Sequence, residues 1–557
     1  MKKRRLFDEK RQMNQSPRPM QLIRILLALL VVVTTARGAE PEPVPQRVMT
    51  LVDCIQAALE YNLGLRIARY GPQIARYNLG GAYGAYDPEF SFSGEHDYSL
   101  SPGGIDAQNR TFSGTETESD RFNTGFRGLL PWGLTYDLGG SLSDRTGTSP
   151  SFAPDFSQSP TITYSTNINL TGPGGPEQIV FASTNFPTVQ IRTPFENTSG
   201  SIGFLQLRQP VLKNFWIDST RLSIAVNKRS LKISELALRS QVMTTVTSVE
   251  QAYYNLIFAR ENVKVQEKAL ELAERLLAEN KKKVEVGALA QLDEKQAESQ
   301  VAQSRADLLA AKNARSIQEN TLKGLLTDDY KTLHEAEVVP AETLMAVPEA
   351  FDLQRSWQVG LSQRPDLLQK KLELEQQGYV VRYQKNQLFP QVDLVGSYGF
   401  SASGREYSSA LGQFQGAESP FYSAGAEFSI PLGNRAVRNT YKVAKATKER
   451  MLLELKSLEQ NAMVLIDNAV KQAQSDFERV DATHQFSLYA EAALDAEQKK
   501  LENGKSTSFE VLRLQRDLTT ARSQEIRALA DYNNSLAQLA LAEATTLERR
   551  RLTLDVK

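Results

Sequence analysis

The chain has 557 residues, of which 41% are hydrophobic and 23% are charged. This length exceeds the roughly 100–200 residues of a usual domain, and the composition is typical of an ordered protein. Lys and Arg (65) balance Asp and Glu (65), which excludes a general nucleic-acid binder with its net basic charge. One cysteine excludes a disulfide framework and a cysteine zinc site, and three scattered histidines offer little for acid–base chemistry. We therefore expect a protein that is not an enzyme, with no catalytic, metal or cofactor-binding site.

The first 38 residues are typical of an export signal. Eight Lys and Arg side chains precede an unbroken apolar run from Ile25 to Val33, and small residues follow it. We expect cleavage after Gly38, with translation starting at either Met1 or Met20. Nine apolar residues cannot cross a bilayer, which needs about 20. Removing this segment takes away nine basic and two acidic side chains, which leaves 56 against 63 and a formal charge of −7.

The remaining chain is predicted to consist of two repeats, residues 39–345 and 346–557. Two sets of matching residues indicate the repetition. The first set has a constant offset of 302 and joins Leu59, Leu65, Pro88 and Gly94 to Leu361, Leu367, Pro390 and Gly396. The second set, residues 282–287 and 499–504, has a smaller offset of 217, because the first repeat carries a long insert at 100–200.

Each repeat is predicted to begin with a helix and to continue with strands. Thr50 and Asp53 have the spacing of a capping box, and the equivalent helix of the second repeat starts near Asp352. After Pro88 and Pro390, apolar and polar residues alternate, which indicates strands. The predicted strands are 89–99, 121–130, 133–145 and 197–209 in the first repeat, and 391–402 and 420–430 in the second. Residues 146–200, rich in Ser, Thr, Pro, Asn and Gly, are expected to form an exposed loop.

One face of these strands is apolar and aromatic. Its residues in the insert all have even numbers: Phe122, Phe126, Leu130, Trp132, Leu134, Tyr136, Leu138 and Leu142. Polar residues at odd positions are Asn123, Arg127, Thr135, Asp137 and Ser141. This alternation is typical of a transmembrane barrel strand and equally of a half-buried sheet in a soluble sandwich.

Two very long helical hairpins, 218–327 and 434–548, complete the repeats. Proline is absent from 218–286 and from 434–503, and polar N-cap candidates stand at Asp218 and Asn434. A heptad repeat predicts coiled packing, and each first helix is on the order of 100 Å long. The heptad positions are Val242, Val249, Leu256, Val263, Leu270, Leu277 and Val284, with a looser copy at Ile466, Ala473, Val480, Leu494 and Leu501. The first helices end at Gly287 and Gly504.

These elements set a constraint on assembly. Neither repeat has enough strands to close a barrel by itself, and an open sheet edge is not tolerated in lipid. The hairpins likewise form a wall only by packing between copies. The combination favours an α+β membrane protein, in which several chains share one transmembrane β-barrel that is continued by a long periplasmic α-helical barrel.

The sequence resembles the TolC family of outer-membrane channels from about residue 51 to 547. The similar motifs are the opening segment Thr50–Asn62, Arg364-Pro365-Asp366-Leu367, the Gln-Pro-Val-Leu at 209–212, and the hairpin tips with an acidic residue six positions later. The resemblance implies a homotrimer with a 12-stranded barrel, four strands per protomer, and a 12-helix periplasmic tunnel. It also implies a duct that works with a periplasmic adaptor and an inner-membrane pump in efflux or type I secretion. The resemblance implies drugs, metal ions or secreted proteins as cargo, and it does not identify which of these is transported or which pump supplies the energy.

The resemblance also implies site residues. The adaptor-docking tips are Val286, Gly287 and Ala288 in the first hairpin, and Asn503, Gly504 and Lys505 in the second. The gate carboxylates at the periplasmic entrance are Asp293 and Glu510.

Two departures bear on this gate. Arg513 stands where some members have a second Asp, so we expect it to pair with a neighbouring carboxylate. Leu501 and Ser506 stand where Tyr and Arg latch the tips in such members. The insert is a third departure, because it offers up to four strands where two are expected. Either the barrel is wider or one hairpin lies outside the membrane.

Two other functions fit parts of the pattern. A periplasmic adaptor also has an export signal and helical hairpins, but it normally has one hairpin within a β domain. A surface-layer structural protein is the second alternative, which aromatic strand faces disfavour.

Overall fold

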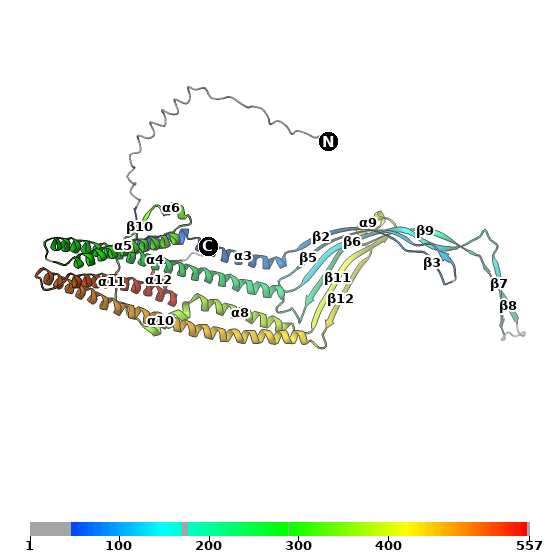
Figure 1. Ribbon diagram of the computed structural model, residues 1–557. Coiled ribbons are helices and arrows are strands. Elements are labelled where there is room, and N and C mark those ends of the chain that lie inside the picture. Colours follow the sequence, from blue (N-terminus) through cyan, green and yellow to red (C-terminus); the bar gives the residue numbers. More distant parts are fainter. Residues whose placement is uncertain (1–45, 108, 170–176, 288, 554–557) are drawn as a thin grey trace, which may run out of the picture. The chain divides into compact units, whose positions relative to one another are not determined.

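The computed structural model describes residues 46–107, 109–169, 177–287 and 289–553 (Figure 1). The predicted signal and its cleavage site lie outside these residues. The described chain forms two compact units, which we call the hairpin unit (46–63, 245–349 and 472–537) and the sheet unit (64–244, 350–471 and 538–553). Each unit contains segments of both predicted repeats, so the repeat boundaries stay a prediction.

The hairpin unit contains the parts of the two helical hairpins that carry their tips, and a group of short elements. Helices α4, α10 and α11 contribute residues to both units. The hairpin helices are α4 (Ser219–Glu285), α5 (Gln291–Leu326), α10 (Arg435–Glu502) and α11 (Ser508–Glu543). The short elements are β1 (Gln46–Met49), α2 (Leu51–Tyr61), α6 (Tyr330–His334) and β10 (Glu337–Pro340), with β1 and β10 paired in parallel. The predicted capping box of Thr50 and Asp53 opens α2.

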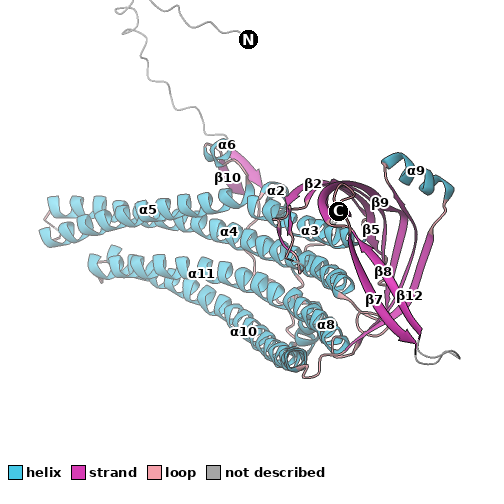
Figure 2. Cartoon of the chain, turned by 90° about the vertical axis from the view of Figure 1, so that its right-hand side faces the viewer, coloured by secondary structure: helices cyan, strands magenta, loops and turns pink. Residues whose placement is uncertain are grey.

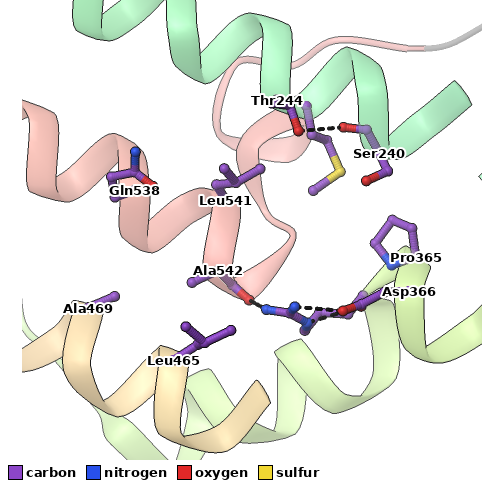
Figure 3. Close-up of a pocket in the computed structure, with 11 residues that line it drawn as sticks. Ser240, Thr244, Pro365, Asp366, Leu465, Ala469, Gln538, Leu541 and Ala542 are labelled. Carbon is purple, nitrogen blue, oxygen red and sulfur yellow. Dashed lines mark hydrogen bonds and ion pairs between the residues drawn. The ribbon is translucent and has the colours of Figure 1, made fainter. Parts of the chain in front are cut away.

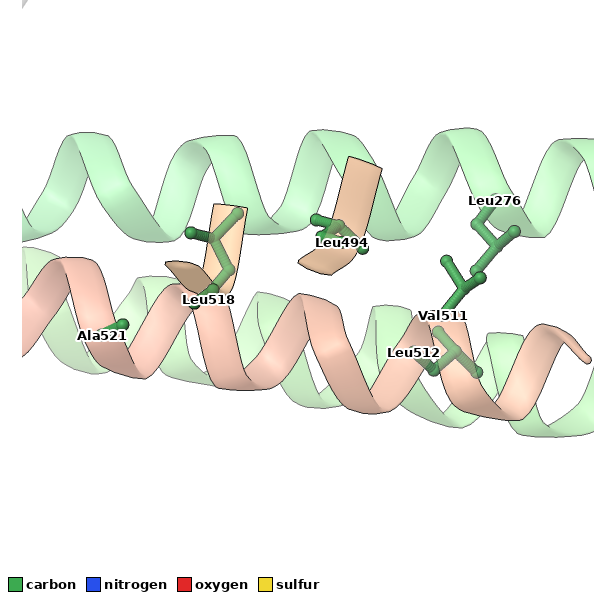
Figure 4. Close-up of a cluster of buried hydrophobic side chains, with 7 residues drawn as sticks. Leu276, Leu494, Val511, Leu512, Leu518 and Ala521 are labelled. Carbon is green, nitrogen blue, oxygen red and sulfur yellow. The ribbon is translucent and has the colours of Figure 1, made fainter. Parts of the chain in front are cut away.

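The heptad positions from Val242 to Val263 are buried as the sequence predicts, whereas Leu270, Leu277 and Val284 are half-buried. Val249, Leu256 and Val263 are buried, and the alanines of the neighbouring column at 252, 259 and 273 are buried too. Small side chains there let the helices approach closely. Near the tips the two hairpins share one apolar cluster, to which α4 contributes Leu276 and α11 contributes Val511 (Figure 4).

The lone cysteine is sealed inside this unit. Cys54 on α2 is 0% exposed, and burial raises the pKa of its thiol to about 12. We expect native protein at pH 8 to leave a thiol reagent such as Ellman's reagent unreacted, and to release one equivalent of chromophore after denaturation. Prompt reaction of the folded protein would contradict this burial.

The sheet unit holds the remaining elements. Its helices are α3 (Leu63–Tyr83, which begins at the border of the two units), the 3-10 turn η1 (Gly84–Tyr86), α7 (Leu353–Gln363), α8 (Pro365–Asn386), α9 (Tyr407–Gly416) and α12 (Thr546–Arg549). Its main strands are β2 (Glu89–Leu100), β5 (Glu116–Leu129), β6 (Thr135–Pro154), β9 (Thr188–Pro210), β11 (Gln391–Gly404) and β12 (Pro420–Ser429).

These main strands form one continuous antiparallel sheet in the described part of the chain. Its order is β12-β11-β9-β6-β5-β2. Figure 2 shows the strands side by side as a curved surface. All six predicted strands are confirmed as members of it. This sheet has two strands more than the four per protomer that the resemblance implied, because β5 and β6 are inserted between β2 and β9.

The loop expected at 146–200 is also wrong. Strands β6 and β9 extend far into it and pair from Thr135–Arg208 up to Pro154–Thr188, and β7 (Thr161–Asn169) pairs with β8 (Glu177–Asn185). A short hairpin of β3 (Gly104–Ile105) and β4 (Thr111–Phe112) lies in the preceding connection. The prediction relied on the polar composition of this segment. The segment also contains Thr, Ile and Val, which favour strands.

Candidate functional site

The sheet has one apolar face, and it is uncovered. Phe90 and Phe92 of β2 are 69% and 68% exposed, and Tyr422 of β12 is 84% exposed. The strand registers place side chains of the inner strands in the same rows, including Phe126, Leu138, Leu205 and Tyr398. A soluble sandwich would bury this face against a second sheet. A broad exposed apolar face instead indicates contact with lipid or with another chain.

The opposite face carries ion pairs, together with one contact between the rings of Phe204 and Phe421. Arg127 of β5 contacts Glu89 of β2 at 2.9 Å. Arg208 of β9 contacts Asp393 of β11 at 2.8 Å and also Glu427 of β12. Strands that alternate apolar outward and polar inward are the pattern of a transmembrane barrel with an aqueous lumen. Of the two alternatives that the sequence left open, this pattern favours the transmembrane barrel.

The tips of both hairpins turn on glycine. Gly287 has φ +76° and Gly504 has φ +69°, and a Cβ added at either would meet open space. Each glycine therefore ends its helix in the left-handed conformation that glycine adopts at low cost. Val286 is 78% exposed beside the first glycine. Ala288, predicted to belong to this tip, lies outside the described residues.

The second tip is closed by hydrogen bonds. Lys505 N donates to the Lys500 carbonyl at 2.8 Å. Ser506 Oγ donates to Glu497 at 2.5 Å, and this bond together with Lys500 holds the pKa of the Glu497 carboxyl below its usual range. Because that pKa is lowered on folding, the contact stabilises the tip at neutral pH and is lost as the pH falls through the folded value. Ser506 thus has a partner within its own tip.

The predicted gate residues do not form one cluster within the described chain. Arg513 Nη2 contacts Glu510 at 2.8 Å, three residues earlier on α11, so the expected carboxylate partner is Glu510 itself. Asp293 lies in the first turn of α5 and forms no ion pair with a described residue. The pairing of Glu510 and Arg513 leaves less net negative charge at this position than two carboxylates would.

Buried polar contacts between the hairpins were not predicted. Asn280 is 0% exposed, and its Oδ1 accepts from Ser508 Oγ of α11 at 3.1 Å. Two similar pairs join α4 to α11 further along, Asn262 with Ser523 at 2.8 Å and Asn255 with Asn534 at 3.2 Å. The signal for Asn280 was present in the sequence. Position 280 belongs to the same heptad column as the alanines at 252, 259 and 273, and a polar residue in such a column implies a specific partner.

The Arg364–Leu367 motif lies at the bend between α7 and α8. The Arg364 guanidinium contacts Asp366 at 2.7 Å and donates to the Ala542 carbonyl at 2.9 Å (Figure 3). It thereby ties the bend between α7 and α8 to the end of α11. The bend borders a cavity of about 350 Å³, whose lining includes Thr244, Leu465 and Leu541. Leu367 is fully buried and anchors the start of α8.

Two features are absent from the described residues. No cluster of His, Cys, Asp or Glu there could hold a metal ion. Among the same residues, no helix carries an apolar stretch long enough to cross a bilayer.

The sequence profile of the family described as "Outer membrane efflux protein" matches residues 189–327 and 358–544, which together exceed half of the chain. The chain belongs to the outer membrane efflux protein family. The matched segments include strands of the sheet and both hairpins. The interpretations as a periplasmic adaptor and as a surface-layer protein are therefore wrong.

Individual relatives agree with the family. The outer membrane efflux protein BepC of Brucella suis biovar 1 (strain 1330) is 23% identical over 363 residues, which cover 64% of this chain and 74% of BepC. The cation efflux system protein CusC of Escherichia coli (strain K12) is 24% identical over 302 residues, 54% of this chain and 63% of CusC. The crystal structure of the Campylobacter jejuni CmeC outer membrane channel matches with a TM-score of 0.59 at 15% identity, over 93% of this chain and 96% of that one, which shows a shared fold.

This efflux-family chain is thus an outer-membrane channel with its helical part in the periplasm.

Proposed function

We propose that three copies of this chain form the outer-membrane duct of a tripartite efflux or type I secretion system. A periplasmic adaptor and an inner-membrane pump deliver the cargo, and the duct conducts it passively to the exterior. The duct performs no catalysis and needs no cofactor. Its substrate class depends on the pump.

The observation that carries this proposal is the uncovered apolar face over an open-edged sheet. Phe92 and Tyr422, on strands at opposite edges of the sheet, both expose most of their surface. In lipid every backbone N–H and C=O needs a partner, so the edges must pair with other copies. A duct shared between copies meets both requirements at once.

Fractionation of cells tests the proposal. We expect the full chain in the outer-membrane fraction, and a detergent-extracted species with the mass of three chains. Recovery of a monomeric, soluble periplasmic species would overturn the proposed duct.

The hairpin tips are proposed to dock the adaptor. The exposed Val286 and the glycines that shape both tips support this assignment, since an apolar side chain at an exposed tip is suited to a partner helix. We expect Val286→Asp to abolish transport while leaving the yield of trimer unchanged. Full transport by this variant would exclude Val286 from the docking surface.

Asp293 and Glu510 are proposed as gate carboxylates, with Arg513 moderating Glu510. We expect Glu510→Ala to reduce block by divalent cations and to raise closed-state conductance in single-channel recordings, because a ring of carboxylates is what binds such ions. Arg513→Ala, which frees the Glu510 carboxylate, should strengthen the block. Unchanged block and unchanged closed-state conductance in Glu510→Ala would remove Glu510 from the gate.

A further inference from the structure

The sheet ends in two open edges. Within the described residues, β2 pairs only with β5, and β12 pairs only with β11. β2 has 12 residues and β12 has 10, close to the 9–11 residues with which a tilted strand crosses a bilayer. Both edges are therefore long enough to be paired across the whole membrane.

The directions of the two edge strands allow them to pair with each other. Every neighbouring pair in the sheet is antiparallel, and the sheet has six strands, so β2 and β12 run in opposite directions. The β2 of a second copy can consequently continue the sheet beside β12 without breaking the alternation. Any number of copies joined in this way keeps an antiparallel sheet.

The registers also indicate the stagger of the strands. The row of paired residues that begins at Glu89 passes through Arg127, Asp137, Gln206 and Ser397 and reaches Ser423. β12 continues six residues further, to Ser429, before the chain returns to a helix. If the first residue of the next copy's β2 is level with the last residue of β12, the sheet shifts by six residues per copy.

This stagger is compatible with a closed barrel. For three copies, a shift of six residues per six strands corresponds to a strand tilt of about 35°, inside the range of known membrane barrels. The same alignment sets Phe90 opposite Phe428 on the apolar face, and Ser93 opposite Gly425 on the polar face. Both faces then continue across the joint.

We propose that the β2 and β12 edges of three copies pair to close a barrel of 18 strands. This inference rests on the proposed trimeric duct and goes beyond it, because the resemblance implied 12 strands. With strands about 4.8 Å apart at this tilt, the barrel would be about 34 Å across between backbones, against about 22 Å for 12 strands. The exit therefore admits cargo of larger cross-section than a 12-stranded exit does.

Cysteine cross-linking in the full chain tests the joint. Cys54 is buried and supplies a silent background. We expect Ser93→Cys combined with Gly425→Cys to give a ladder ending at the trimer after treatment of outer membranes with a short bis-maleimide. Each single variant should give no trimer. As a matched control, Ser141→Cys on β6 combined with Gly425→Cys should give none.

The opposite cross-linking result would indicate a narrower barrel. Cross-linking through Ser141 and not Ser93 would mean that β2 and β5 lie outside the barrel, and would overturn the 18-stranded closure. Electron cryomicroscopy of the purified trimer counts the strands independently, and a trimer with 12 would overturn this inference alone. A monomeric or soluble protein would instead overturn the proposed duct.

Discussion

Phe92→Arg is expected to deplete the outer membrane of assembled channel. Phe92 is on the apolar face of β2 and is 68% exposed, so the substitution puts a guanidinium where the barrel meets lipid. An arginine on the lipid face costs up to about 2–4 kcal/mol, depending on its depth in the bilayer, which is a large part of the stability of a typical domain. The measurement is the amount of trimer that detergent extracts from the outer-membrane fraction.

Ser91→Arg provides the matched control on the same strand. Ser91 points to the polar face, and an arginine there can stay in the aqueous lumen. We expect trimer yield close to that of the natural protein. Equal yields for the two variants would show that the aromatic face does not meet lipid.

Asn280→Asp is expected to destabilise the hairpin unit strongly at neutral pH. The side chain of Asn280 is fully buried, and its amide donates to the Asp293 carbonyl at 3.5 Å while accepting from Ser508. A carboxylate retains the acceptor but loses the donor, and burial of the charge costs several kcal/mol. Melting of the helical circular dichroism signal of the full channel reports the loss.

The effect should depend on pH. Burial raises the pKa of the introduced carboxyl, so the penalty is present above that raised pKa and decreases as the pH falls below it. Asn313→Asp on the exposed surface of α5 is the control, and should melt like the natural protein at each pH. A melting deficit of Asn280→Asp that stays the same down to pH 4 would argue against the buried charge as its cause.

The sequence predicted those features that repeat along the chain. Heptads reveal a buried seam because every seventh residue faces the same neighbour, and Val249 and Leu256 are indeed buried. Gly287 and Gly504 ended their helices as expected, since the positive φ there favours glycine. The six main strands were found because an alternating pattern persists over their length.

Features that depend on distant pairing were not predictable. Residues 146–200 read as a loop by composition, whereas the pairing of β6 with β9 gives their backbones partners that composition cannot reveal. The ion pair of Glu510 and Arg513 is local, and only the choice of partner was left open by the sequence. Asn280 and Ser508 are 228 residues apart, and their contact required the packing of two hairpins.

The burial of Cys54 has a consequence for the life of the protein after export. The periplasm is kept oxidising, so a lone reactive thiol on a chain that gathers in several copies would form unwanted disulfides between copies. Because the pKa of the Cys54 thiol is about 12, the thiolate fraction at pH 7 is on the order of 10⁻⁵. The Cys54 side chain also has no exposed surface. The folded channel therefore keeps its single thiol reduced through burial alone, and only chains that fail to fold are open to oxidation.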